Sequence, residues 1–448
     1  MEILLGFLIS FCLLIISVIK GIFIGYALIT CWVVFALISI KKGYTIKEII
    51  KMSYNGGKQS FIVIKILLLI GAVIGVWMAS GTIAAIVYYC LEFLTPSLFI
   101  FFSFIICCIV SFLIGTSLGS ISVVGIPLMI IARSGHVNLN ITAGAIIAGV
   151  YFGDRCSPMS SSAALVANLT KTNIFTNMKN MIYSSIVPFS LSLFFYYILS
   201  ISQPLRNMNS NLSNEISGTF NIAFITLFPA IIILILSLFK VKLYFSASIS
   251  IIIASIFALV FQQHNLLDII KFIILGFQTS PHSPLHNVLK GGGIVSMLQP
   301  CLVMFVSCSL SGIFKELNIF NSFKKVITNK NLTKHKLFSV ISIVSIMTAA
   351  FGCNQTISSV MTNEIMKDSY KNIGKYRFAL DLENSGIIIA ALIPWNISAL
   401  VPTTTLNVSA IKYIPYAFYL YMLPIIYFIY LRYSNKFLKI RLNRHTLS

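Results

Sequence analysis

Long apolar runs that contain few or no charged residues recur along the whole chain. Clear examples occupy residues 3–19, 22–40 and 413–431. A helix needs about 20 apolar residues to cross the hydrocarbon core of a bilayer, because each residue adds only about 1.5 Å to its length. Hydrophobic residues make up 58% of the 448 residues and charged residues only 10%, a balance that water-soluble proteins do not show. The sequence therefore predicts an all-α polytopic membrane protein with the lipid bilayer as its main partner.

The basic residues gather in short segments between the apolar runs. Lysine and arginine number 32 against 11 acidic residues, and they concentrate at 41–58, 324–336, 367–377 and 432–444. Segments of this kind stay in the cytoplasm by the positive-inside rule, so the net charge of +21 does not indicate a nucleic acid partner. We expect both chain ends in the cytoplasm. The abundance of Ile, Asn and Lys is typical of AT-rich bacterial genomes, which predicts a bacterial cell (inner or plasma) membrane.

Four of the apolar stretches are interrupted near their middle by residues that stop helices. We interpret 98–132 and 337–366 as re-entrant hairpins. Basic segments flank both ends of the second hairpin, so it is expected to enter from the cytoplasm and the first one from outside. The stretches 141–168 and 378–400 are interpreted as interrupted crossings. These assignments give about ten transmembrane helices plus two re-entrant hairpins.

The order of these elements repeats along the chain. Nearly the same number of residues separates Gly115 from Pro188 as separates Gly352 from Pro424. Two halves with hairpins that enter from opposite sides would be inverted repeats, and inverted repeats with interrupted helices are typical of secondary active transporters. A homodimer is compatible with the sequence, which does not decide the oligomeric state. The predicted division is 1–200 for the first repeat, 201–218 for an external linker, 219–432 for the second repeat and 433–448 for a basic cytoplasmic tail.

Two acidic residues fall inside the interrupted crossings. Asp154 and Glu383 do so, one in each half and at places interpreted as corresponding, and Asp381 lies one turn from Glu383 on the cytoplasmic side. An ionised carboxylate inside a bilayer is costly unless something compensates it, so such residues are usually functional. We therefore predict that Asp154 and Glu383 bind the transported cation or substrate.

Oxygen-bearing residues near these two acids complete the predicted site. Hard cations such as Na+ prefer oxygen ligands from carboxylates, hydroxyls, amides and backbone carbonyls that a helix break sets free. The other predicted binding residues are Ser157, Asn384, Ser385, Asn396, Thr116, Ser117, Asn354, Gln355 and Thr356. The predicted helix-break residues are Gly115, Gly119, Gly153, Pro158, Gly352, Gly386 and Pro394.

Plainer interpretations exist for the same residues. Asp154 could pair with Arg155 or cap a helix, and the glycines and prolines could be packing kinks of the kind common in membrane helices. The nine cysteines lack metal-ligand spacing, so we expect free thiols, no metal site and no cofactor. An intramembrane aspartyl protease would need a glycine-x-glycine-aspartate pattern, but Tyr151 occupies the place of the first glycine, so no enzyme is expected.

These motifs together resemble the NhaC-type Na+/H+ antiporter family of the ion transporter superfamily. The matching stretches are 115–119, 144–158, 382–386 and 393–396, and the similarity is clearest over 112–199 and 349–431. The resemblance implies Na+/H+ exchange, which some members couple to an organic acid such as malate and lactate.

The sequence departs from the family pattern at three acids. The family usually has aspartate where Ser161 stands, a second acid where Asn384 stands, and aspartate where Cys353 stands. Fewer titrating ligands are therefore present than the family pattern provides.

Two mechanisms fit these observations. In the first, Asp154 and Glu383 bind Na+ and protons in turn, because a carboxylate removed from water is easier to protonate and the two cations then compete for one site. In the second, a Na+- or H+-coupled transporter carries a small organic acid or amino acid, whose carboxylate is held by helix N-termini at the hairpin tips.

Overall fold

The computed structural model describes residues 2–58, 60–93, 95–205, 211–239, 241–279, 290–317 and 333–437. Within these residues the chain is almost entirely helical, and the only sheet is an antiparallel ribbon of β1 (Phe277–Gln278) and β2 (Lys290–Gly291). Eight of the described helices are long and apolar enough to cross a membrane, and a bent pair, Lys375–Leu392 with Ile397–Leu406, would make a ninth. The protein is therefore an all-α polytopic membrane protein, as the sequence predicts.

The helices up to residue 205 are α1 (Glu2–Ile19), α2 (Ile24–Lys41), α3 (Ile46–Lys58), α4 (Phe61–Ala79), α5 (Thr82–Phe93), α6 (Phe99–Ile114), α7 (Ser117–Ser120), α8 (Ile126–Ser134), α9 (Leu139–Cys156), α10 (Ser161–Thr170) and α11 (Ile174–Ser202). The later ones are α12 (Asn211–Thr219), α13 (Phe228–Leu238), α14 (Leu243–Val260), α15 (Leu266–Leu275), α16 (Leu298–Glu316), α18 (Lys334–Gly352), α19 (Gln355–Met366), α20 (Lys375–Leu382), α21 (Ile397–Leu406) and α22 (Phe418–Phe437). The short segments are η1 (Pro96–Leu98), η2 (Ile121–Gly125), η3 (Phe224–Leu227), η4 (Ile294–Met297), η5 (Lys367–Tyr370), η6 (Glu383–Ile387), η7 (Ala390–Leu392) and η8 (Ile414–Tyr416), of which η2 and η6 are π-helical.

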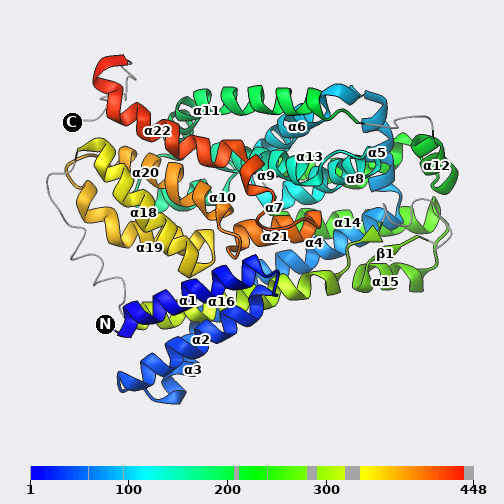
Figure 1. Cartoon of the computed structure of the whole chain (residues 1–448). Helices are drawn as coiled ribbons and strands as arrows, with labels where there is room; N and C mark the ends of the chain where they lie inside the picture. The colour runs from blue at the N-terminus through cyan, green and yellow to red at the C-terminus, as the bar shows by residue number, and fades with distance from the viewer. Residues whose placement is uncertain are drawn as a thin grey trace.

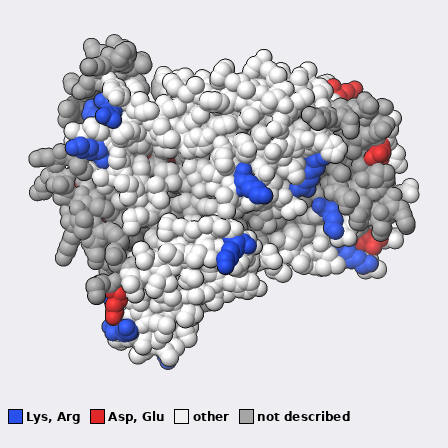
Figure 2. Space-filling view, in the orientation of Figure 1, with Lys and Arg blue, Asp and Glu red and all other residues white. Residues whose placement is uncertain are grey.

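The long helices run roughly along one direction of the molecule (Figure 1). α18, α19 and α20 lie in the left half of this view, and α6, α8 and α5 lie in the right half. α1 begins and α22 ends on the left side. The face shown in Figure 2 has wide areas without charged side chains, as contact with lipid requires.

The two predicted hairpins turn with the same backbone geometry. α6 ends on Gly115 in the left-handed region (φ 71°, ψ 22°), and α18 ends on Cys353 in the same region (φ 49°, ψ 11°). The next residues, Thr116 (φ −146°, ψ 130°) and Asn354 (φ −144°, ψ 131°), are extended and cap the following helix with a side-chain oxygen. The second break therefore lies at Cys353, one residue later than the predicted Gly352, which is the last residue of α18.

The two interrupted crossings also break in the same way. α9 ends before the extended residue Ser157, and η7 ends before the extended residue Ile393; a proline follows in both cases. The N-caps Ser160 and Asn396 then open α10 and α21, each through a side-chain oxygen that accepts a backbone N–H. Both of these helices have 10 residues and close on a left-handed residue. The same local fold thus occurs twice in the chain.

Some predicted helix-break residues do not interrupt a helix. Gly119 lies inside the first turn of α7, where its N–H bonds to Thr116 Oγ1. Gly153 lies inside α9, and a Cβ there would stand 2.5 Å from the backbone nitrogen of Phe112, so this glycine serves close packing of α9 on α6. Gly386 lies within the π-helical η6. The residues located at the breaks themselves are Gly115, Pro158 and Pro394.

The basic segment 41–58, interpreted from the sequence as a loop, contains the amphipathic helix α3. Ile49, Ser53 and Gly56 form its buried face. Gly56 and Gly312 bring the backbones of α3 and α16 together, since a Cβ on either one would lie 2.3 Å from a carbonyl oxygen of the other helix. Burial of the apolar face explains why a lysine-rich segment folds here.

Other predicted segments are described only in part. The predicted linker 201–218 contains most of α12, and residues 206–210 within it lie outside the described residues. Most of the basic segment 324–336 also lies outside them, as does the tail from residue 438 onward.

We expect Gly312→Val to separate α3 from α16. The added side chain would collide with the carbonyl oxygen of Met52, and overpacking of this kind costs about 1–3 kcal/mol. The thermal unfolding midpoint of the purified protein in detergent measures this loss. Gly218→Val is the matched control, because no described heavy atom outside its own helix backbone lies within 4 Å of the position of its added Cβ. Equal midpoints for the two variants would contradict the close contact.

Candidate functional site

Asp154 lies in the last turn of α9 and is buried, with 6% of its surface exposed. Its Oδ1 accepts hydrogen bonds from Ser160 Oγ at 2.7 Å and from Ser162 Oγ at 3.5 Å, both at the start of α10. The hydroxyl and the backbone N–H of Ser117, the first residue of α7, also interact with this carboxylate. Helix N-termini carry partial positive charge, so the starts of two helices stabilise the anionic form of Asp154.

Glu383 lies at the start of η6 and is completely buried. Neither of its carboxylate oxygens has a hydrogen-bond partner among the described residues. The carboxylate interacts electrostatically with Arg155 and with Asp154, so the structure brings the two predicted acids into one electrostatic neighbourhood. A buried carboxylate without hydrogen bonds is costly as an anion, and this cost falls when a cation or a proton binds it.

Arg155 is completely buried. No ion pair joins the two residues in the described part of the chain, so Arg155 is not the partner of its neighbour in sequence. Its charge instead interacts with Glu383, and this interaction partly offsets that carboxylate. The guanidinium donates to Met181 O at 3.2 Å, Ser185 Oγ at 2.6 Å, Ser184 Oγ at 3.1 Å, Tyr419 OH at 3.2 Å and Asn384 Oδ1.

Asp381 differs from Glu383 in having a full set of partners. Arg377 Nε donates to it at 2.7 Å, and the hydroxyls of Tyr370 and Tyr427 donate to it at 2.8 Å each. A carboxylate held by three donors in the protein is a structural ion pair and has little need of a further cation.

Three predicted oxygen ligands are engaged in holding the breaks. The side-chain oxygens of Thr116, Asn354 and Asn396 each accept a backbone N–H at the start of the helix that follows. Ser157 Oγ donates to Phe112 O at 2.6 Å and so ties the first break to α6. These side chains therefore shape the interruptions, and of the hairpin tips only Ser117 reaches an acid.

The remaining predicted residues lie on or beside η6. Asn384 Oδ1 accepts from Arg155, while its Nδ2 has no partner among the described residues. Ser385 Oγ donates to the carbonyl of Asp381 at 2.6 Å. Gln355 Nε2 donates to Ile387 O at 2.9 Å and ties the tip of the second hairpin to η6. Thr356 is exposed.

The two acids do not occupy corresponding positions, contrary to the interpretation from sequence. Asp154 precedes the break residue Ser157 by three positions, whereas Glu383 precedes Ile393 by ten. The reason is that η6 and η7 lengthen the second crossing on the near side of its break. Asp154 therefore lies close to the break of its own half, whereas Glu383 lies farther along the chain from its break.

Several residues at the site were not singled out from the sequence. Ser160 and Ser162 bind Asp154, and the serine run after Pro158 is the signal that could have identified them. Tyr151, one turn before Asp154, donates from its hydroxyl to Ser398 O at 2.7 Å and links α9 to the start of α21. No local pattern pointed to Tyr419, because it meets Arg155 from α22, far away in sequence.

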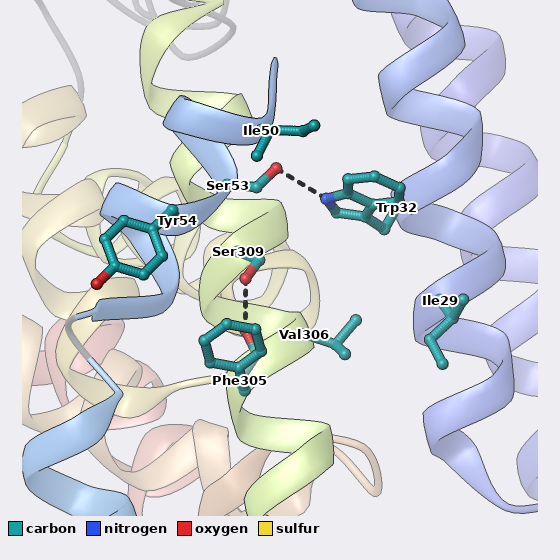
Figure 3. Close-up of a pocket in the computed structure, with 8 residues that line it drawn as sticks. All are labelled: Ile29, Trp32, Ile50, Ser53, Tyr54, Phe305, Val306 and Ser309. Atoms are coloured by element: carbon teal, nitrogen blue, oxygen red, sulfur yellow. Dashed lines mark hydrogen bonds between the residues drawn. The ribbon is translucent and has the colours of Figure 1, made fainter. Parts of the chain in front are cut away.

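An apolar cavity of about 310 Å³ lies apart from the carboxylates, between α2, α3 and α16 (Figure 3). Most of its polar side chains are already paired: Trp32 Nε1 donates to Ser53 Oγ at 2.9 Å, and Ser309 Oγ donates to Phe305 O at 2.8 Å. This cavity therefore has little to offer a polar cargo. In the described part of the chain no three His, Cys, Asp or Glu side chains come together as a metal site.

We expect Asp381→Asn to cost more stability than Glu383→Gln. Breaking the buried Asp381–Arg377 pair leaves Arg377 without its counter-charge, at a cost of about 3 kcal/mol. Glu383→Gln also removes an anion that interacts with the buried Arg155, but it breaks no hydrogen bond in the described structure and relieves a buried charge, so its loss of stability should be smaller. Thermal unfolding of the purified variants at neutral pH without Na+ measures both effects. Equal losses in the two variants would contradict these different roles.

Comparison with known proteins gives a consistent result. The model of the Na+/H+ antiporter family matches residues 149–435. The malate-2H+/Na+-lactate antiporter of Bacillus subtilis (strain 168) is 29% identical over 405 residues, covering 88% of this chain and 86% of that protein. The Na+/H+ antiporter NhaC of the same organism is 28% identical over 393 residues, covering 86% of each chain. The arginine/ornithine antiporter ArcD of Halobacterium salinarum is 25% identical over 401 residues, covering 86% of this chain and 81% of that protein. The family model covers more than half of the chain, and this protein therefore belongs to the Na+/H+ antiporter family.

Proposed function

We propose that this chain is a secondary active transporter that exchanges Na+ for protons at a site formed by Asp154 and Glu383. The observation that carries the proposal is the buried Glu383 carboxylate, which has no hydrogen-bond partner among the described residues and interacts electrostatically with Asp154. Such a carboxylate is stable in the protein interior when a proton or a cation neutralises it. Na+ and a proton then compete for the same charge, which is the basis of exchange.

The charges at the site favour one cation at a time. Asp154 and Glu383 are the acids, and Arg155 is a positive charge whose two terminal nitrogens lie within hydrogen-bonding distance of five oxygen atoms. With both acids ionised, the three side chains carry a net charge of minus one. One Na+ or one proton neutralises this charge, so the loaded site is the form best suited to crossing a medium of low dielectric constant.

The two halves, 1–200 and 219–432, are proposed to be inverted repeats that move against each other. This is supported by the matching φ and ψ values at the two hairpin tips and by the matching breaks that open α10 and α21. The hairpin formed by α18 and α19 lies on the left of Figure 1, and α6 and α8 lie on the right, as opposite entry requires. Rocking of one bundle would then expose the acids alternately to the two sides.

The proposed orientation places both ends of the chain in the cytoplasm of a bacterial cell. The basic segments near 41–58 and 367–377 support it by the positive-inside rule. In Figure 1 the start of α1 and the end of α22 lie on the same side as the open end of the α18–α19 hairpin.

A second candidate function is exchange that also carries a small carboxylated metabolite. The relative named a malate-2H+/Na+-lactate antiporter is similar over 88% of this chain, and another relative is named for arginine and ornithine. Three acids of the family pattern are replaced by Ser161, Cys353 and Asn384, which lowers the negative charge that an anionic cargo would meet.

Asp154→Asn and Glu383→Gln should each lower Na+-dependent proton exchange at least tenfold, because either change removes a charge for which the two cations compete. Everted membrane vesicles with a pH-sensitive dye report the exchange. Glu364→Gln is the matched control, an exposed acid on α19 that does not touch the site. Exchange at the normal rate in either site variant, at equal membrane content, would refute the assignment.

Cysteines at the open ends of the two hairpins should face opposite sides of the membrane. Ser97→Cys, just before α6, should react with an impermeant maleimide only from outside, and Lys334→Cys, at the start of α18, only from the cytoplasm. Both positions are exposed. Cys12→Ser provides the background, since Cys12 is the exposed native thiol. Labelling of both variants from one side would exclude the inverted arrangement.

A further inference from the structure

A second cavity, of about 200 Å³, lies between two groups of helices. α4, η4 and β2 form one wall, and α8 and α21 form the other. Polar side chains line much of it, in contrast to the cavity of Figure 3. They are Arg133, Lys290, Ser296, Thr404, Thr405 and Asn407.

The charge of this cavity is positive. Among the described residues that line it, Arg133 and Lys290 are basic and none is acidic. Neither forms an ion pair within the described ranges. Arg133 makes one hydrogen bond there, from Nη2 to Leu406 O at 2.6 Å at the end of α21, and this leaves most of its guanidinium donors available. Na+ would be repelled from such a cavity, whereas an anion would be attracted.

The donors present suit a carboxylate. The planar guanidinium of an arginine matches the two oxygens of a carboxylate, and a lysine adds a second point charge. Threonine hydroxyls at the rim can bind further oxygens of the same ligand. The volume lies below the roughly 300–1,000 Å³ of sites for drug-sized ligands, so a molecule of a few carbon atoms fits best.

The cavity is joined to the acidic site by both helices of one wall. α8 continues from α7 and η2, and α7 begins at Ser117, which interacts with Asp154. α21 begins beside Ser398, whose carbonyl accepts the hydroxyl of Tyr151, and it ends at Leu406, which Arg133 binds. A ligand in the cavity would therefore contact one end of a helical segment whose other end reaches Asp154, and one end of a helix whose other end binds Tyr151, one turn from Asp154. The helices of the opposite wall, α4 and η4, take part neither in the contact between Ser117 and Asp154 nor in the contact between Ser398 and Tyr151.

We propose that this cavity binds the carboxylate of a small organic anion through Arg133 and Lys290, at the ends of α8 and α21 that lie away from Asp154. The inference rests on the second candidate function and gives it a binding site. It also separates the two cargoes in space: the cation binds at the acids, and the organic anion binds at the positive cavity.

A purely structural role for Arg133 predicts a different result for the variants of this residue. If its only task were to bind Leu406 O at the end of α21, its charge would not matter to anion binding. Arg133→Gln removes the charge and leaves a neutral donor on a shorter side chain, and Arg133→Lys keeps the charge and loses the fork. The binding site predicts that Arg133→Gln loses anion binding in protein that remains folded, and that Arg133→Lys retains part of the binding.

The test uses the full-length protein, purified and reconstituted in proteoliposomes. Lactate, malate, succinate and arginine are the probes, measured by thermal stabilisation and by uptake of labelled compound, with chloride at equal ionic strength as the ion control. The wild type should bind at least one carboxylate that chloride does not mimic. Arg133→Gln should weaken that binding roughly tenfold or more, the loss expected for a hydrogen-bonded charge, and Lys290→Gln should weaken it less. Lys412→Gln, an exposed lysine outside the cavity, should bind as the wild type does.

Two results would overturn the inference: no probe binds to the wild type, or Arg133→Gln binds as tightly as the wild type. Na+/H+ exchange without any organic acid is measured in parallel on Asp154→Asn. If Asp154→Asn abolishes exchange while Arg133→Gln binds the probes normally, only the anion site is refuted. If Asp154→Asn exchanges normally, the proposed cation site is refuted whatever the cavity binds.

Discussion

The absence of water from the hydrocarbon core of a bilayer is the constraint on which the rest of the structure depends. A helix can be interrupted there only if other protein groups bind the backbone atoms that the break sets free. At the second break Ile397 N–H donates to Cys353 O at 2.9 Å, and Asn396 Nδ2 donates to Ala349 O at 2.8 Å. At the first break Ser157 Oγ binds Phe112 O. Each hairpin tip thus packs on the break of its own half, and the two irregular regions stabilise each other.

The same constraint gives the two buried acids different properties. Asp154 receives hydrogen bonds from the serines that begin α10, so the protein itself stabilises its negative charge. Glu383 lies on a π-helical segment, its carboxylate has no hydrogen bonds in the described structure, and the charge of Arg155 offsets it only in part. The fold itself therefore stabilises the charge of Asp154, whereas the charge of Glu383 is stabilised when a cation or a proton binds to it. π-helical segments are frequent at functional sites because they widen the helix and turn side chains to unusual directions.

Arg155 connects this site to the rest of the protein. Its donors reach Ser184 and Ser185 on α11, Tyr419 on α22 and Asn384 on η6. A guanidinium held in this way by neutral groups keeps its charge in a fixed place, since every donor it uses is bound to a rigid helix. Any movement of α11 or α22 relative to η6 would change the distance between Arg155 and Glu383, and with it the affinity of that carboxylate for a cation. In the second cavity, Arg133 of α8 is likewise a positive charge held by a hydrogen bond, here to Leu406 O at the end of α21.

The sequence by itself determined the class of fold and indicated where the membrane helices that contain the acids are interrupted. Apolar runs of spanning length require transmembrane helices, and glycine, proline and acidic residues inside such runs mark the interruptions, because these are local consequences of chain length and side-chain chemistry. It did not determine that Cys353 takes the left-handed conformation, that the lysine-rich α3 packs on α16, or that Arg155 interacts with Glu383 and binds groups of α11, α22 and η6. Only the tertiary structure decided these features, because each depends on atoms supplied by residues far away in the chain, and hydrogen bonds and charges act through space.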